Sequence, residues 1–112
     1  MFDQTVFNKE LSTSWLGREL FYFQELESTN TYAKKVSKEA SLHGTLVLAD
    51  HQTAGRGQHQ RTWTIEPCQN LTFSLIFEPQ QSDRLSILTL ACALAVCEYI
   101  EENLKVSAQL KW

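Results

Sequence analysis

The pattern of apolar and polar residues along the chain predicts four strands. The aromatic-rich run at 20–26 is typical of a strand, and TLVLAD at 45–50 is typical of a short buried one. In LTFSLIF at 71–77, large apolar residues alternate with more polar ones, which indicates a strand with two unlike faces. VSAQLKW at 106–112 predicts the beginning of a fourth strand.

Helical patterns occupy the intervals between these strands. The Ser-Thr-Asn run at 28–30 supplies N-cap chemistry for a helix over about 30–42, which His43-Gly44 should end. Residues 82–103 indicate one long helix that is apolar nearly all round in its first two-thirds, so we expect it to be buried under a sheet. This order of elements predicts an α+β or α/β fold, with helices packed on a mixed β-sheet.

Composition and charge narrow the classes of function. The chain has 112 residues, 43% of them hydrophobic, which suits one small domain or part of a larger one. A net charge of −3, with dispersed lysines and arginines, argues against a nucleic-acid-binding domain. The longest apolar stretch, at 85–97, is shorter than the roughly 18 residues of a membrane span. The three cysteines lack framework spacing, and the N-terminus lacks a signal-peptide layout, so we expect a cytoplasmic protein.

The loop QTAGRGQHQRTW at 52–63 holds two of the four glycines and two arginines. A dinucleotide fingerprint would need a third glycine where Gln60 stands, and a Walker A loop would need Gly-Lys-Ser/Thr. A third interpretation is a loop that folds over an anionic ligand. Its glycines would admit close approach of the backbone, Arg56 and Arg61 would supply bidentate charge, and Trp63 would offer a flat surface for a base. The alternative is a flexible polar loop whose tryptophan is anchored in the core.

Several motifs taken in order give this loop a context. ESTNTYAKK, DHQTAGRGQHQRTW, NLTFSLIF, a long helix and a terminal Lys-Trp together resemble the catalytic domain of the biotin protein ligases, also called biotin–[acetyl-CoA-carboxylase] ligases. The resemblance covers about residues 20–112. It implies an α+β catalytic fold like that of the class II aminoacyl-tRNA synthetases, with ATP, Mg²⁺ and biotin as ligands.

In that family, biotin is activated with ATP to biotinyl-5′-AMP and then passed to one lysine of a biotin carboxyl carrier protein, such as a subunit of acetyl-CoA carboxylase. Because a carboxylate attacks a phosphate, the enzyme must neutralise charge and position the reactants, and it need not supply a nucleophile. Mg²⁺ carried with ATP would share that work. The side chains at 28–30 and at Gln52 offer donors and acceptors for the ureido ring of biotin.

The resemblance also implies roles for individual residues. Those implied to contact biotin are Ser28, Thr29, Asn30, Gln52, Arg56, Gly57, Gln58 and Lys111. Those implied to hold ATP or the adenylate are Gly55, Arg56, Gly57, Arg61 and Trp63. Arg56 and Lys111 are the implied catalytic cations, and no residue is assigned to a metal. Many members carry Arg-Arg-Gly where this chain has Gln58-His59-Gln60, so its loop is less cationic and lacks a glycine.

Each assignment has a simpler structural alternative. Residues 28–30 would cap a helix in any case, Trp63 could be a core anchor, and Lys111 could be a solvated strand residue. We interpret residues 1–112 as part of a catalytic domain, without the N-terminal winged-helix domain of some members and without the C-terminal barrel domain.

The implied partner is a biotin carboxyl carrier protein. Neither nucleic acid nor a membrane is implied, and a homodimer stays open. Two other functions also stay open: a lipoate or octanoate ligase or transferase of the related fold, and a fragment that binds biotin or its adenylate without catalysis. The activity of the 112-residue chain by itself is a further open point.

Overall fold

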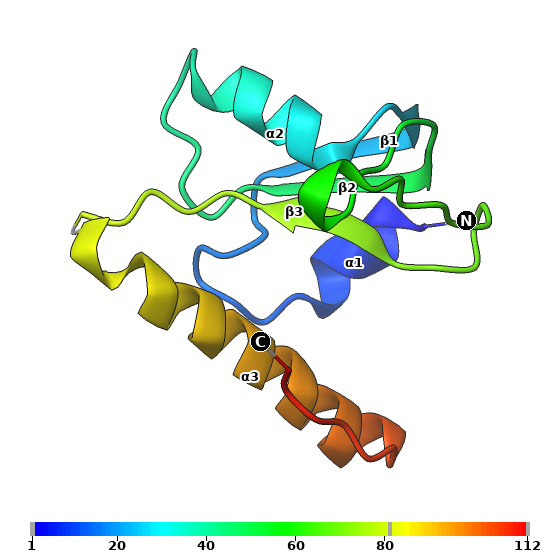
Figure 1. Cartoon of the computed structure of the whole chain (residues 1–112), viewed down its shortest axis with the longest axis vertical. Helices are drawn as coiled ribbons and strands as arrows, with labels where there is room; N and C mark the ends of the chain where they lie inside the picture. Colours follow the sequence, from blue (N-terminus) through cyan, green and yellow to red (C-terminus); the bar gives the residue numbers. More distant parts are fainter. Residues whose placement is uncertain (1, 81, 112) are drawn as a thin grey trace. The chain divides into compact units, whose positions relative to one another are not determined.

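The computed structural model describes residues 2–80 and 82–111 of the chain (Figure 1). Two compact units are present, residues 1–78 and residues 79–112. The first holds the sheet and the second holds a long helix.

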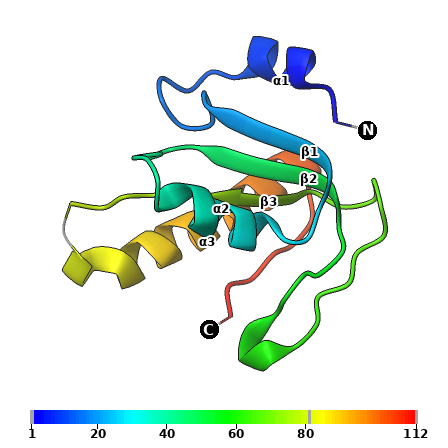
Figure 2. The same ribbon diagram turned by 90° about the horizontal axis from the view of Figure 1, so that it is seen from above.

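Three strands form the sheet of the first unit, with the second strand in the middle (Figure 2). They are β1 (Leu20–Leu26), β2 (Leu46–Gln52) and β3 (Thr72–Leu75). β1 and β2 run parallel, whereas β3 runs antiparallel to β2. The first three predicted strands are therefore confirmed, although β3 is shorter than the predicted 71–77. The mixed sheet expected from the sequence is present.

Helix α2 (Thr29–Ser37) connects the two parallel strands. Its N-cap is Ser28, whose hydroxyl oxygen accepts a hydrogen bond from the Thr31 N–H at 3.3 Å, as the sequence predicts. The predicted end near residue 42 is wrong. The Ser37 hydroxyl donates back to the Ala33 carbonyl at 2.6 Å, and the following residues bind elsewhere in the fold instead of continuing the helix.

Those following residues are held by Glu78, the last residue of the first unit. Its carboxylate accepts hydrogen bonds from the Ser41 hydroxyl at 2.5 Å and the Leu42 N–H at 2.9 Å. The Glu78 N–H donates to Nδ1 of His43 at 2.9 Å. These three bonds fix the turn that leads from α2 into β2.

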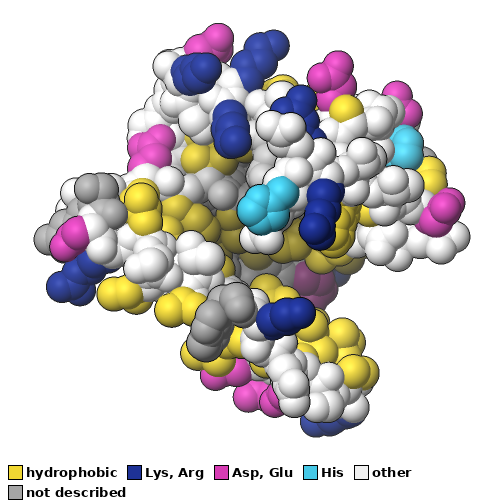
Figure 3. All heavy atoms as spheres, in the orientation of Figure 1, with side chains coloured by type: hydrophobic (Ala, Val, Ile, Leu, Met, Phe, Trp, Pro, Cys, Tyr) yellow, Lys and Arg dark blue, Asp and Glu magenta, His cyan; other side chains and the backbone are white. Residues whose placement is uncertain are grey.

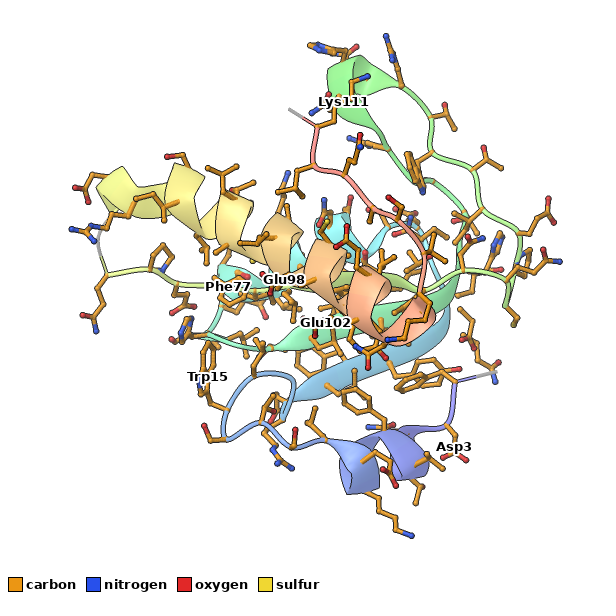
Figure 4. The ribbon with its side chains drawn as sticks, turned by 90° about the horizontal axis from the view of Figure 1, so that it is seen from below. Asp3, Trp15, Phe77, Glu98, Glu102 and Lys111 are labelled. Atoms are coloured by element: carbon orange, nitrogen blue, oxygen red, sulfur yellow. The ribbon has the colours of Figure 1, made fainter. Side chains whose placement is uncertain are left out.

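Gly44 completes this turn, with a φ of +84°. A Cβ atom at this position would lie 2.5 Å from the Trp15 ring. Trp15 in turn stacks on His43, with 4.7 Å between ring centroids, and meets Phe77 edge-on at 6.4 Å (Figure 4). Glycine is required here both by the left-handed backbone and by the tryptophan.

α2 packs on one face of the sheet, and the core of the first unit lies between them (Figure 1). Its buried centre is Ala33, Val47 and Ile76, and the half-buried residues around it are Phe21, Leu26, Tyr32, Val36 and Leu42. Of the two faces of the 71–77 segment, the one that carries the more polar residues faces α2. Ile76 is 7% exposed on this face, whereas Leu71 on the other face is 70% exposed.

The sequence pattern assigns no element to residues 1–16, but the structure has a helix there, α1 (Gln4–Glu10). The carboxylate of its N-cap Asp3 accepts a hydrogen bond from the Val6 N–H at 3.1 Å. α1 lies on the sheet face opposite α2, where Phe2 contacts Tyr22 with 5.2 Å between ring centroids. An apolar groove of about 380 Å³ runs between α1 and this face.

The second unit consists of a 3₁₀ turn, η2 (Ser82–Arg84), a helix, α3 (Leu85–Leu104), and the segment that follows it. The long helix predicted at 82–103 is confirmed, with its first turn tightened to 3₁₀. Many of its apolar side chains are exposed, and hydrophobic atoms line its surface in Figure 3. The burial of this helix under the sheet, which the sequence predicts, involves both units and therefore stays a prediction. Among the described residues, no helix is long and apolar enough to cross a membrane.

The strand predicted at 106–112 is wrong for the described residues, because 106–111 have no regular secondary structure. Lys105 adopts a left-handed conformation with φ +56°, which ends α3. The Ala108 N–H then donates to Oε1 of Glu101 at 3.3 Å, and the Cys97 thiol donates to the Ala108 carbonyl at 3.3 Å. A strand needs a neighbouring strand for its N–H and C=O groups, and the described residues of this unit include helical elements but no strand. Trp112 lies outside the described residues.

Replacing Glu78 with Gln should make folding stability less dependent on pH. The hydrogen bonds from Ser41 and the Leu42 N–H lower the pKa of the Glu78 carboxyl from its usual 4.5. The ionised group therefore stabilises the fold above about pH 4.5, and this contribution is lost as the pH falls through the lowered pKa. We expect Glu78→Gln to lower Tm, measured by circular dichroism, more at about pH 7 than at about pH 3. An equal change at both pH values would contradict this, and Glu10→Gln is the control.

Candidate functional site

A pocket of about 240 Å³ lies in the first unit, where α2 begins and β2 ends. It is bounded by the start of α2, the end of β2, the loop that follows β2, and β3. The residues that line it are Ser28, Thr29, Asn30, Gln52, Arg56, Trp63, Leu71, Thr72, Phe73 and Ser74.

The parallel pairing of β1 and β2 brings Gln52 to the beginning of α2. Gln52 is the register partner of Leu26, and α2 begins at Thr29, only three residues after Leu26. The Thr29 N–H, which has no partner inside the helix, donates to Oε1 of Gln52 at 2.7 Å. The amide nitrogen of Gln52 then remains as a donor.

The loop that follows β2 folds into a narrow hairpin at residues 55–63, which extends away from the sheet (Figure 2). The Gly57 N–H donates to the Arg61 carbonyl at 2.7 Å, and the Trp63 N–H donates to the Gly55 carbonyl at 2.8 Å. Arg56 and Thr62 pair as an isolated antiparallel bridge. We call residues 55–63 the loop hairpin.

The two glycines of the loop hairpin have different structural requirements. A Cβ on Gly55 would lie 2.5 Å from the Trp63 carbonyl oxygen and 2.8 Å from Nε2 of Gln52, so no side chain fits there. A Cβ on Gly57 would meet nothing closer than 3.6 Å, and the Gly57 φ of −100° suits any residue. The hairpin therefore requires glycine at 55 but does not require it at 57.

The tip of the loop hairpin has no glycine. His59 and Gln60 have φ angles of +56° and +63°, in the left-handed region that favours glycine. Gln58, predicted to contact biotin, is exposed in the short 3₁₀ segment η1 (Gln58–Gln60) and does not line the pocket. The tip is thus formed by two residues in an unfavourable backbone conformation.

Arg56 lines two neighbouring spaces. It borders the first pocket and also a second one of about 420 Å³, formed with Ala54, Gly55, Gln60, Arg61 and Thr62. Trp63 is 59% exposed, so the alternative in which it anchors the loop in the core is wrong. A cation that borders both spaces can face two anionic groups at once.

Most of the residues expected at the site are brought together. Ser28, Thr29, Asn30, Gln52, Arg56 and Trp63 share the first pocket, while Gly55, Arg56 and Arg61 share the second. Gly57 lies in the hairpin between them but lines neither space. Lys111 is exposed in the second unit, and its part in the site stays a prediction (Figure 4).

Sequence reasoning missed the wall that β3 supplies. Ser74 lies 2.8 Å from Oγ1 of Thr29, and its hydroxyl donates to Oδ1 of Asn30 at 2.6 Å. Thr72 lines the same pocket. The signal was available, because Thr72 and Ser74 are the polar members of an otherwise apolar strand pattern.

The pocket is suited to binding and charge neutralisation. Arg56 is its only titratable lining residue among those that the structure describes. On the other face of the sheet, the Tyr22 hydroxyl donates to the Asp50 carboxylate, which raises the pKa of Tyr22 to about 12. Within residues 2–80 and 82–111, no group of three or more His, Cys, Asp or Glu side chains could hold a metal ion.

Known proteins with similar sequences are ligases. The sequence profile of the biotin/lipoate A/B protein ligase family matches residues 20–112. The bifunctional ligase/repressor BirA of Bacillus subtilis is 37% identical over 103 residues, and that of Bacillus spizizenii is 35% identical over the same length. Each match covers 91% of this chain and 32% of the relative, so the chain spans about a third of their length.

Solved structures show the same fold. The biotin protein ligase of Aquifex aeolicus in complex with biotin and ATP superposes with a TM-score of 0.70 and 32% identity, over 85% of this chain and 39% of that one. The Leishmania major enzyme in complex with biotinyl-5-AMP gives a TM-score of 0.64 and 31% identity, over 84% and 38% of the two chains. The chain belongs to the biotin/lipoate A/B protein ligase family.

Proposed function

We propose that this chain forms the substrate-binding part of a biotin protein ligase. Such an enzyme activates biotin with ATP to biotinyl-5′-AMP and transfers the biotinyl group to a lysine of a biotin carboxyl carrier protein. The observation that carries the proposal is the pocket at the start of α2. It gathers Ser28, Thr29, Asn30, Gln52, Arg56 and Trp63, the positions that the family resemblance assigns to biotin and the adenylate.

The start of α2 suits a small polar ring. Helix N-termini present N–H groups and a partial positive charge, and Ser28 and Thr29 are 7% and 3% exposed, so they are held in place. The amide nitrogens of Gln52 and Asn30 add donors to this wall. The ureido carbonyl of biotin offers the acceptor that such donors require.

The adenylation step places its main demand on Arg56. A carboxylate oxygen of biotin attacks the α-phosphorus of ATP, an O–P bond forms, and pyrophosphate leaves as the bond to the bridging oxygen breaks. Arg56 borders both pockets, so its guanidinium can face the carboxylate in one and the α-phosphate in the other. This lowers the repulsion between the two anions. ATP enters as its Mg²⁺ complex, and Lys111 is proposed as a second cation.

The transfer step uses the lysine of the carrier protein as the nucleophile. Its neutral amine attacks the acyl carbon of biotinyl-5′-AMP, an amide bond forms, AMP leaves with the electron pair of the C–O bond, and the amine loses a proton. The pocket contributes by holding the anhydride and keeping it from water. Because the chain spans about a third of its relatives, both steps are proposed for the whole protein.

Biotin-dependent ATP–pyrophosphate exchange tests the proposal. The protein that carries this chain should exchange labelled pyrophosphate into ATP when biotin is added, because the first step is reversible. Octanoate, the substrate type of the related lipoate branch, should support no exchange. Exchange with octanoate alone would assign the protein to that branch, and exchange with neither would refute an adenylating function.

Replacing Arg56 with Ala should slow adenylation and speed loss of the intermediate. One neutralising contact to a developing charge typically contributes about 100-fold to kcat, so we expect a drop of about that size. Arg61→Ala is the matched control, because Arg61 lines only the second pocket and should mainly raise KM for ATP. Single-turnover kinetics with trapped biotinyl-5′-AMP measures both quantities. Unchanged retention of the intermediate in Arg56→Ala would show that Arg56 does not hold it.

Gly55→Ala and Gly57→Ala should separate the fold of the loop from its contact with ligand. Gly55→Ala forces apart Trp63 and Gln52, so it should disturb the free hairpin and weaken biotin binding. Gly57→Ala should leave the free chain unchanged but weaken biotin binding, if the hairpin backbone approaches the ligand at this glycine. NMR of the hairpin amides and calorimetric titration with biotin distinguish the two. Unchanged amide shifts in Gly55→Ala would contradict the steric argument.

A further inference from the structure

We infer that Ser74 is a positioning residue, which sets the hydrogen-bonding polarity of the pocket through Thr29 and Asn30. The inference rests on the proposed function, because it concerns how the same pocket distinguishes biotin from acids without a ureido group. Ser74 lies on β3, more than 40 residues from the start of α2 in sequence, and is half-buried.

Three side chains form a short chain of contacts across the pocket wall. Oγ of Ser74 lies 2.8 Å from Oγ1 of Thr29 and 2.6 Å from Oδ1 of Asn30. Thr29 is 3% exposed, so little water competes for its hydroxyl. These contacts link β3 to the first turn of α2.

Counting hydrogens fixes which of these three side chains donates to which. A hydroxyl carries one hydrogen, and that of Ser74 is donated to Asn30, whose Oδ1 can only accept. The 2.8 Å contact between Ser74 and Thr29 then requires the Thr29 hydrogen to point at Ser74. The Thr29 hydroxyl can also donate to Oε1 of Gln52 at 3.2 Å, but that oxygen already accepts the shorter bond from the Thr29 N–H at 2.7 Å. The order of donation is Thr29 to Ser74 to Asn30.

This order leaves two amide groups with their NH₂ ends free. The oxygens of Asn30 and Gln52 are both occupied, and within the described part of the chain neither amide nitrogen donates to another residue. Both residues line the pocket. A ligand group that offers an acceptor oxygen, such as the ureido carbonyl, satisfies these donors, whereas an octanoyl chain or a dithiolane ring leaves them unpaired.

Loss of the Ser74 hydroxyl removes this constraint. Asn30 can then turn its amide, and the Thr29 hydroxyl can turn toward Gln52, so the wall no longer presents one fixed pattern. The Ser74 hydroxyl takes part in two hydrogen bonds of ordinary strength, with Thr29 and Asn30. We therefore expect its loss to lower biotin affinity about tenfold.

Ser74→Thr and Ser74→Val are a matched pair of variants that test this role. Both side chains are β-branched, similar in volume and suited to a strand, but only threonine keeps the hydroxyl. In the natural protein, Ser74→Val should raise the calorimetric Kd and the KM for biotin about tenfold, and the KM for ATP by less than about twofold. Ser74→Thr should stay close to the parent. Ser37→Ala is the control, because it removes a hydroxyl from α2 that bonds only to the Ala33 carbonyl.

The outcomes separate this inference from the proposed function. Equal biotin affinity in Ser74→Val and Ser74→Thr, with a parent protein that binds biotin, would overturn the positioning role and leave the function standing. A parent that does not bind biotin would overturn both. If Ser74→Val does not fold, Asn30→Asp decides, since it keeps the acceptor for Ser74 but loses the NH₂ donor. Unchanged biotin affinity in Asn30→Asp would then refute the inference.

Discussion

The site depends on one hydrogen bond, from the Thr29 N–H to Oε1 of Gln52 at 2.7 Å. It pairs the first free N–H of α2 with the last residue of β2, and the parallel β1–α2–β2 unit brings these two groups together. Because Gln52 is fixed, the backbone after it must pass close by, and this requirement leads to Gly55 and the loop hairpin. Arg56, the next residue along the chain, borders both pockets.

Much of the fold could be predicted from local signals. The strands at 20–26 and 45–50 and the Ser28 cap were confirmed because the apolar pattern and the cap chemistry act within a few residues. The end of α2 was missed because Ser41 and Leu42 bind Glu78, which lies more than 35 residues away. The strand predicted at 106–112 was wrong for residues 106–111, because a strand requires a partner strand and the described residues of its own unit form none.

The residues of the site were predicted from the order of the sequence motifs more than from the chemistry of each residue. Taken alone, residues 28–30 and Gln52 are a helix cap and a loop residue, and only the family resemblance placed them on one ligand. Ser74 was missed because its role arises from a contact 44 residues away in sequence, with Asn30. An alternating strand pattern shows which residues share a face but not which element covers that face.

The residues Gln58-His59-Gln60 at the tip of the loop hairpin affect both its charge and its backbone conformation. Positions 58–60 carry no lysine or arginine, and His59 and Gln60 take left-handed conformations that glycine would adopt without strain. Such a conformation costs an L-residue roughly 1–2 kcal/mol. Any rearrangement that returns these two residues to negative φ recovers this energy, which offsets part of the loss of conformational entropy on ordering the loop over a ligand. The left-handed residues at the tip therefore make the free conformation of the loop hairpin easier to leave.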